Sequence, residues 1–134
     1  ILLPNSKPER HNSPMKHKHF AFFAYHVTDI DRARDFYENT LQLPPAENFD
    51  NQWVEYELDG VTFAITNMVE QLKPGAHGGF FAIEVEDLDA AVAEMKSKNV
   101  PFILDTFETP VCRMAVIADP DGNGVTLHAC KARE

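Results

Sequence analysis

An internal repeat is the feature of this sequence that most constrains its fold. A twelve-residue stretch beginning at Phe22 returns at Phe80, with seven of the twelve positions identical and a constant offset of 58 residues. Average composition would give roughly one identity in a window of this length. A shorter second match joins residues 60–63 (Gly-Val-Thr-Phe) to residues 124–127 (Gly-Val-Thr-Leu). The chain is therefore predicted to contain two halves of about 60 residues that share one structural plan.

Each half has the local pattern of a strand, a helix and three further strands. In the first half, Thr28 or Asp29 can cap a helix with apolar residues at helical spacing, and Pro44 and Pro45 end it. The first half is predicted to contain a strand over 22–27, a helix over 30–41, and strands near 46–49, over 53–58 and over 61–66. The second half is predicted to contain a strand over 80–85, a helix over 87–98, and strands near 102–104, over 113–118 and over 125–130.

Alternation along the strands gives each strand one apolar face and one mixed face. We expect the apolar faces to pack under the helices and the mixed faces to line a ligand cavity. The mixed faces are formed by Phe22, Ala24 and His26, by Trp53, Glu55 and Glu57, by Thr62, Ala64 and Thr66, by Phe80, Ala82 and Glu84, and by Thr126, His128 and Cys130.

Charge and composition narrow the class of partner. The 134 residues suit one domain, and 21 acidic against 12 basic residues give a net charge of −9. Nucleic acid is an unsuitable partner because phosphate binding needs a basic surface, whereas a cationic or neutral small molecule fits. No apolar run approaches the roughly 18 residues of a membrane span, and the beginning of the sequence lacks the pattern of a secretory signal. Cys112 and Cys130 are expected to be reduced, buried thiols of a cytoplasmic protein.

The first residues differ from the rest of the chain. Residues 1–18 are rich in Pro, Asn, Lys and His without an apolar period, and are expected to be a disordered or loosely attached leader. His11, His17 and His19 lie near it and are expected to be solvated, with metal binding as the alternative. Residues 19–134 are expected to form a single domain, with modules over about 19–70 and 77–131.

Three stretches of the two halves carry a family resemblance. They are residues 26–37 (HVTDIDRARDFY), residues 81–92 (FAIEVEDLDAAV) and residues 119–127 (DPDGNGVTL). Together they resemble the vicinal oxygen chelate superfamily, which comprises glyoxalases, bleomycin-resistance proteins and extradiol dioxygenases, over residues 19–131. The resemblance implies an α+β fold in which two pseudo-twofold βαβββ modules form an open barrel. It also implies a homodimer, because members of this length usually assemble in pairs.

The metal-binding positions of the resembling family are occupied here by other residue types. Metal-using members place a His seven residues before the helix-starting Asp of each half and a Glu in the last strand of each half. Those positions carry Phe22 and Phe80, and Thr62 and Thr126. Phenylalanine cannot ligate a metal and neutral hydroxyls are poor ligands, so we expect no cofactor at these positions.

A displaced metal site is the alternative. His26, Glu84 and His128 lie on the same mixed faces, a few residues further along their strands, and Glu55 and Glu57 lie on a neighbouring strand. The candidates for catalysis are His26, Glu84 and His128. Ordinary roles compete with this interpretation, namely hydrogen-bonded histidines and solvated or ion-paired carboxylates.

Three functions are consistent with the sequence. The first is a module that binds a small molecule without metal, as bleomycin-resistance proteins do. The second is a metal-dependent lyase, isomerase or dioxygenase that uses the displaced site, and the third is a metal-free enzyme that uses His26 or His128 with a carboxylate. Phe22 and Phe80 are expected to face one cavity, with a packed aromatic core as the alternative. The predicted ligand-binding residues are Phe22, Trp53, Glu55, Glu57, Thr62, Phe80, Arg113 and Thr126, of which Arg113 has no assigned face.

Overall fold

The two halves of the repeat fold into two βαβββ modules, as predicted. The computed structural model describes residues 21–70, 73–75 and 79–131, so the predicted leader lies outside the described residues. Module 1 consists of β1 (Phe23–His26), α1 (Ile30–Arg34), the π-helical segment η1 (Asp35–Thr40), β2 (Pro45–Phe49), β3 (Trp53–Leu58) and β4 (Val61–Thr66). Module 2 consists of β5 (Phe80–Glu84), α2 (Leu88–Ser97), β6 (Phe102–Glu108), β7 (Cys112–Ala118) and β8 (Gly124–Cys130).

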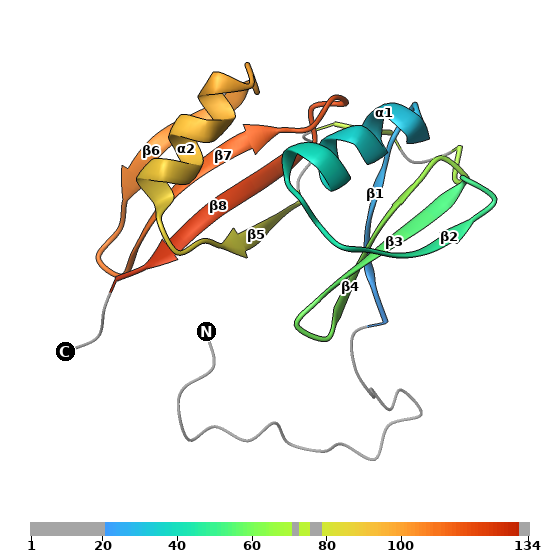
Figure 1. Cartoon of the computed structure of the whole chain (residues 1–134), viewed down its shortest axis with the longest axis horizontal. Coiled ribbons are helices and arrows are strands. Elements are labelled where there is room, and N and C mark those ends of the chain that lie inside the picture. Colours follow the sequence, from blue (N-terminus) through green and yellow to red (C-terminus); the bar gives the residue numbers. More distant parts are fainter. Residues whose placement is uncertain (1–20, 71–72, 76–78, 132–134) are drawn as a thin grey trace, which may run out of the picture.

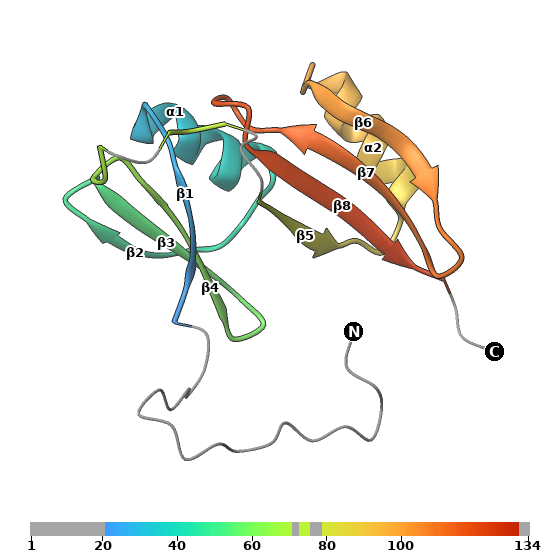
Figure 2. The same ribbon diagram turned by 180° about the vertical axis from the view of Figure 1, so that it is seen from behind.

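Each module forms its own four-stranded sheet with the same topology. The strand orders are β1-β4-β3-β2 and β5-β8-β7-β6, in which the first pair is parallel and the other pairs are antiparallel. A parallel pair needs a long crossover connection, and the helix followed by two strands supplies it in both modules. The modules lie side by side, and each helix packs against one face of its sheet (Figures 1 and 2).

Both helices begin at an aspartate of the repeat. Asp29 accepts a hydrogen bond from the Arg32 backbone N–H at 3.1 Å, and Asp87 accepts one from the Ala90 N–H at 3.0 Å. The first helix differs from the prediction because its second part is π-helical. The Leu41 N–H donates to the Phe36 carbonyl at 2.9 Å, a spacing of five residues.

The apolar strand faces and the helices enclose one core that both modules share. Its members include Tyr37, Tyr56 and Ile65, which are fully buried. Phe63 of module 1 and Phe81 of module 2 pack with ring centroids 4.5 Å apart. Burial raises the pKa of the Tyr37 hydroxyl well above its usual value, because the charged form would lose its solvation.

The turn between β7 and β8 joins the two modules. Asp119 is buried and accepts a hydrogen bond from the Tyr37 hydroxyl at 2.9 Å. Asp121 accepts hydrogen bonds from the Thr28 hydroxyl at 2.5 Å and from the Arg32 guanidinium at 3.2 Å. In Figure 1 this turn reaches toward α1. The DPDGN turn (residues 119–123) therefore holds the two modules together through hydrogen bonds.

Strand register corrects one detail of the repeat. Ala24 pairs with Ala64 in module 1, and Ala82, its repeat partner, pairs with Thr126 in module 2. The structural equivalent of Thr126 is therefore Ala64 and not Thr62. The short sequence match was misleading because β4 is shifted by two residues, which preserves the alternation of faces.

The two cysteines differ in exposure. Cys112 is buried as predicted, with the Thr109 hydroxyl 3.0 Å from its sulfur, but Cys130 at the end of β8 is exposed. In the described part of the chain, no helix is long and apolar enough to cross a membrane.

Candidate functional site

The positions that hold metal in the resembling family are unsuited to a cation in this structure. Phe22 and Phe80 are half or more exposed, at 52% and 61%, and offer no donor atom. Phe80 pairs with Gly124, which has no side chain, and Ala64 is apolar. The one polar group is the Thr126 hydroxyl, which is buried and has no hydrogen-bond partner among the described residues. One neutral hydroxyl cannot offset the desolvation of a dication.

Module 1 instead presents an aromatic–acidic face, formed by Phe22, Phe49, Trp53, Glu55 and Glu57. The rings of Phe22 and Trp53 meet edge to face with centroids 5.0 Å apart and an interplanar angle of 87°. Phe49 pairs with Trp53 across β2 and β3, so both side chains lie on the same face. Half of the Phe22 and Phe49 surfaces is accessible, which leaves an aromatic surface for a ligand.

Two carboxylates on this face are held by neighbouring side chains. Trp53 donates its indole N–H to Glu55 Oε2 at 2.8 Å, and the Thr62 hydroxyl donates to Glu57 Oε1. Thr62 thus positions a carboxylate. Negative charge beside exposed aromatic rings attracts a cation from two directions, through Coulomb interaction and through the ring faces.

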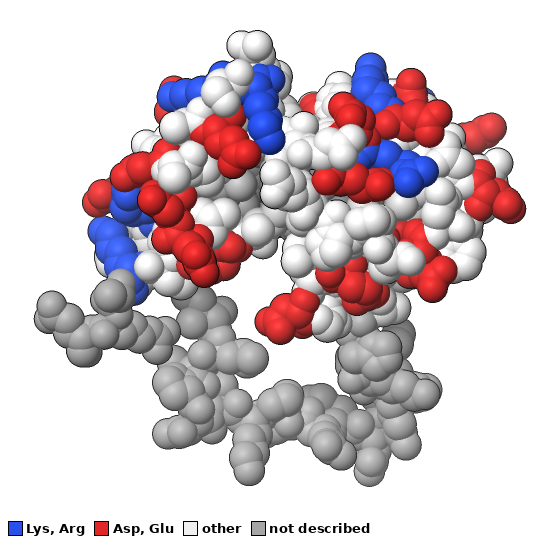
Figure 3. Space-filling view, viewed as in Figure 1, with Lys and Arg blue, Asp and Glu red and all other residues white. Residues whose placement is uncertain are grey.

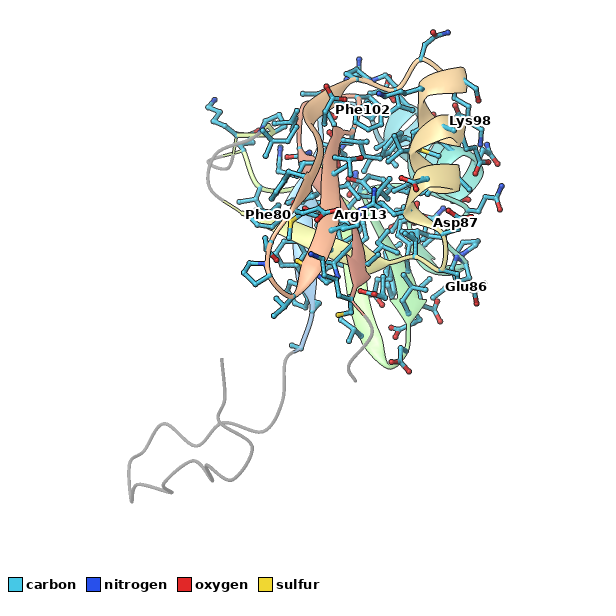
Figure 4. All side chains as sticks on the ribbon, turned by 90° about the vertical axis from the view of Figure 1, so that its left-hand side faces the viewer. Phe80, Glu86, Asp87, Lys98, Phe102 and Arg113 are labelled. Carbon is cyan, nitrogen blue, oxygen red and sulfur yellow. The ribbon has the colours of Figure 1, made fainter. Side chains whose placement is uncertain are left out.

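Phe80 gives module 2 an exposed aromatic ring as well. In Figure 4 it lies on the side of the sheet away from α2, which carries Asp87 at its beginning. Among the described residues, no ring contact joins Phe22 to Phe80. A single chain therefore leaves both rings on open surfaces. Their convergence on one cavity stays a prediction.

The displaced catalytic candidates separate into two places. Glu84 and His128 come together, because β5 and β8 pair them in register and His128 Nδ1 lies 2.6 Å from Glu84 Oε1. His26 lies on β1 of module 1, and both of its ring nitrogens are buried without a hydrogen-bond partner in the described structure. Cys130 lies next to Glu84 and His128, on the face predicted by strand alternation, although its residue type in an apolar stretch gave no signal for a site.

Arg113 lies on the opposite side of the module 2 sheet from these groups. Its neighbours Cys112 and Met114 share the face of Cys130 and His128, so Arg113 points to the helix-covered side. There it forms ion pairs with Asp89 at 3.0 Å and with Glu108 at 3.4 Å. Arg113 therefore lies on the side of the sheet opposite Thr126 and His128.

Charge on the surface is predominantly negative. Asp and Glu side chains are spread over both modules in Figure 3, whereas Lys and Arg gather in fewer places. A shallow hollow of about 260 Å³ lies on the outer side of the first helix, lined by Asp31, Arg34, Asp35, Glu38 and Asn39. Arg34 and Glu38 pair there at 2.7 Å, and this ion pair holds the pKa of the Glu38 carboxyl below its usual value. The charged side chains that line this hollow already have partners within the chain. The aromatic–acidic face is therefore the better candidate site.

Solved structures of similar fold come from several bacteria. TnmS3, an antibiotic binding protein from Streptomyces sp. CB03234, is 24% identical with a TM-score of 0.75, covering 87% of this chain and 99% of its own. Lactoylglutathione lyase from Agrobacterium tumefaciens is 19% identical with a TM-score of 0.67, covering 86% and 96%. A superfamily member from Sphaerobacter thermophilus DSM 20745 is 24% identical with a TM-score of 0.68, covering 83% and 98%.

Sequence comparison identifies the family directly. No curated protein sequence matches this chain. The sequence profile of one family matches residues 18–127, which is most of the chain and extends from before β1 into β8. The chain therefore belongs to the Glyoxalase/Bleomycin resistance protein/Dioxygenase superfamily.

Proposed function

We propose that this protein binds a small, planar, cationic or neutral aromatic compound on its aromatic–acidic face and releases it unchanged, without a metal. The observation that carries the proposal is the edge-to-face pair of Phe22 and Trp53, which leaves half of Phe22 accessible beside Glu55. A flat ligand can stack on this surface, which is already formed before binding. The fold of TnmS3, described as an antibiotic binding protein, supports sequestration as the biological role.

The carboxylates define the preferred charge of the ligand. Glu47 pairs with Glu55 across β2 and β3, and Glu57 follows two residues later, so three carboxylates lie on one face. A bound cation would be stabilised by Glu55 and Glu57, both of which already have a hydrogen-bond donor fixing their orientation. An anionic ligand would be repelled, which agrees with the net charge of −9.

We further propose that a second copy of the chain completes the cavity. The exposed phenylalanines Phe22, Phe49 and Phe80 leave apolar surface open in the single chain. A cavity between paired modules would enclose a ligand that one open face can hold on only one side.

Intrinsic fluorescence tests the binding proposal, because Trp53 is the single tryptophan of the chain. Titration with a panel of planar aromatic antibiotics should quench this fluorescence for cationic and neutral members and leave it unchanged for anionic ones. Phe22→Ala should weaken binding about fivefold or more, since one ring contact contributes about 1 kcal/mol. The double variant Glu55→Gln and Glu57→Gln should weaken cationic ligands while sparing neutral ones.

Matched controls separate local effects from general ones. Val111→Ala removes an exposed apolar side chain between β6 and β7, and Glu86→Gln removes an exposed carboxylate before α2. Both variants should bind as the parent chain does. Mass analysis of the recovered ligand should find it unaltered, and a changed mass would indicate an enzyme. Equal affinity of Phe22→Ala and the parent chain for every ligand would contradict the proposal.

A further inference from the structure

Three residues with different metal-binding atoms lie close together at the C-terminal ends of β5 and β8. The atoms that Glu84, His128 and Cys130 offer to a metal all lie within 4.8 Å of one another. Parallel pairing places Glu84 beside His128, and strand alternation places Cys130 on the same face two residues later. Glu84 lies four residues from Phe80, about 13 Å along an extended strand, so this cluster is separate from the ring of Phe80.

Glu84 is held in place before any ligand arrives. Its Oε1 lies 2.6 Å from His128 Nδ1, and its Oε2 accepts a hydrogen bond from the Cys130 backbone N–H at 2.8 Å. These two contacts fix both oxygens of the carboxylate, which is therefore oriented toward the other two groups before a cation binds.

The donor set selects the kind of cation. One thiolate sulfur, one imidazole nitrogen and one carboxylate oxygen suit Zn²⁺, which takes all three types, whereas Mg²⁺ and Ca²⁺ prefer oxygen alone. Tetrahedral zinc at normal bond lengths separates its ligand atoms by roughly 3.5 Å, so the contact between Glu84 and His128 must open slightly. Because the cluster is exposed, a cation reaches it without losing all of its water.

We propose that Glu84, His128 and Cys130 form a Zn²⁺ site at the end of the module 2 sheet, with its fourth position open to solvent. On binding, the cation takes the position between His128 Nδ1 and Glu84 Oε1, the neutral imidazole carries its one proton on Nε2, and the Cys130 thiol releases its proton to solvent. The Cys130 N–H remains bonded to Glu84 Oε2 and keeps the carboxylate in position. This site differs from the positions of Phe22, Thr62, Phe80 and Thr126 and does not depend on the proposed ligand-binding function.

Metal titration of the full chain tests the site. Co²⁺ should produce the charge-transfer absorption of a cobalt–thiolate bond at one equivalent, and Zn²⁺ should abolish it by displacement. Competition with a chromogenic chelator then measures the affinity for Zn²⁺. Cys130→Ser, His128→Ala and Glu84→Gln should each lower that affinity about 100-fold or more, because loss of a ligand exceeds loss of an outer-shell partner.

Two controls exclude other donors. Cys112→Ser removes the thiol on β7 directly across from Cys130, and it should leave the cobalt–thiolate absorption intact. Replacing His11, His17 and His19 by Ala removes the histidines near the beginning of the chain and should leave one equivalent of Zn²⁺ bound. Absence of the thiolate absorption in the parent chain, or its persistence in Cys130→Ser, would overturn the proposal. Far-ultraviolet circular dichroism establishes that each variant is folded.

Discussion

At the scale of single residues, the buried Asp119 accepts four hydrogen bonds, one of which comes from the other module. Its Oδ2 accepts hydrogen bonds from the Tyr37 hydroxyl and the Asn123 amide at 2.9 and 2.8 Å. Its Oδ1 accepts hydrogen bonds from the backbone N–H groups of Asn123 and Asp121 at 2.7 and 2.9 Å. Burial nevertheless raises the pKa of its carboxyl, because desolvation outweighs these four donors.

Replacing Asp119 should destabilise the whole chain. In Asp119→Ala, the Tyr37 hydroxyl and the Asn123 amide lose their acceptor in a buried place, so we expect a loss of about 3 kcal/mol in the free energy of unfolding. Urea unfolding followed by circular dichroism measures this loss. Asp89→Ala is the control, because its side chain is 76% exposed and its ion pair with Arg113 contributes about 1 kcal/mol at most. Equal stability of the two variants would contradict the role of Asp119 in holding the modules together.

At the scale of secondary-structure elements, the repeat reappears in the way each helix begins. Asp29 and Asp87 stand 58 residues apart, both have extended backbone, and both accept a hydrogen bond from the N–H three residues later. After these caps the helices diverge. The first becomes π-helical over Asp35–Thr40 and buries Phe36 and Tyr37, whereas the second stays α-helical over its ten residues.

The two caps should be energetically equivalent. Asp29→Ala and Asp87→Ala each remove the acceptor of one helix-terminal N–H and should lower the free energy of unfolding by about 1 kcal/mol. Asp29→Asn and Asp87→Asn should restore most of it, because asparagine caps nearly as well. Thermal and urea unfolding of all four variants provides the measurement. A clear loss in both asparagine variants would show that charge, and not capping, is responsible.

At the scale of the whole molecule, the shared core lies on the helix side and the mixed sheet faces are left open. Tyr25 of module 1 donates its hydroxyl to the Gly124 carbonyl of module 2 at 2.6 Å, and burial raises its pKa to about 12. This buried hydrogen bond therefore connects the two modules inside the protein. The opposite faces expose Phe22 and Phe80, and a pair of chains is the arrangement that covers such faces symmetrically.

We predict that the protein sediments as a homodimer at micromolar concentration. Phe80→Asp should shift it toward the monomer, because a charge would be buried without a partner in the interface. Met68→Asp is the control, since Met68 is about as exposed as Phe80 but follows the end of β4 in module 1. A parent chain that sediments only as a monomer, or a Phe80→Asp variant that stays dimeric, would contradict this prediction.

The sequence determined the modules because repeats and alternation are local properties. Seven identities in twelve positions predicted two equal units, and period-two alternation correctly placed Tyr25 and Val27 inside and Phe22 outside. The same alternation placed Glu84, His128 and Cys130 on one face. It could not show that they meet, because contact depends on the stagger between β5 and β8, which no strand encodes alone.

Tertiary structure decided the register and the pairing of charges. The sequence match at 60–63 aligned Thr62 with Thr126, but packing of β4 against β1 made Ala64 the equivalent residue. Arg113 had no assignable face until α2 brought Asp89 within 3.0 Å. Local pattern specifies which side of a strand a residue occupies, with a period of two. Its neighbours across the sheet follow from shifts between strands, which are selected by packing of the whole core.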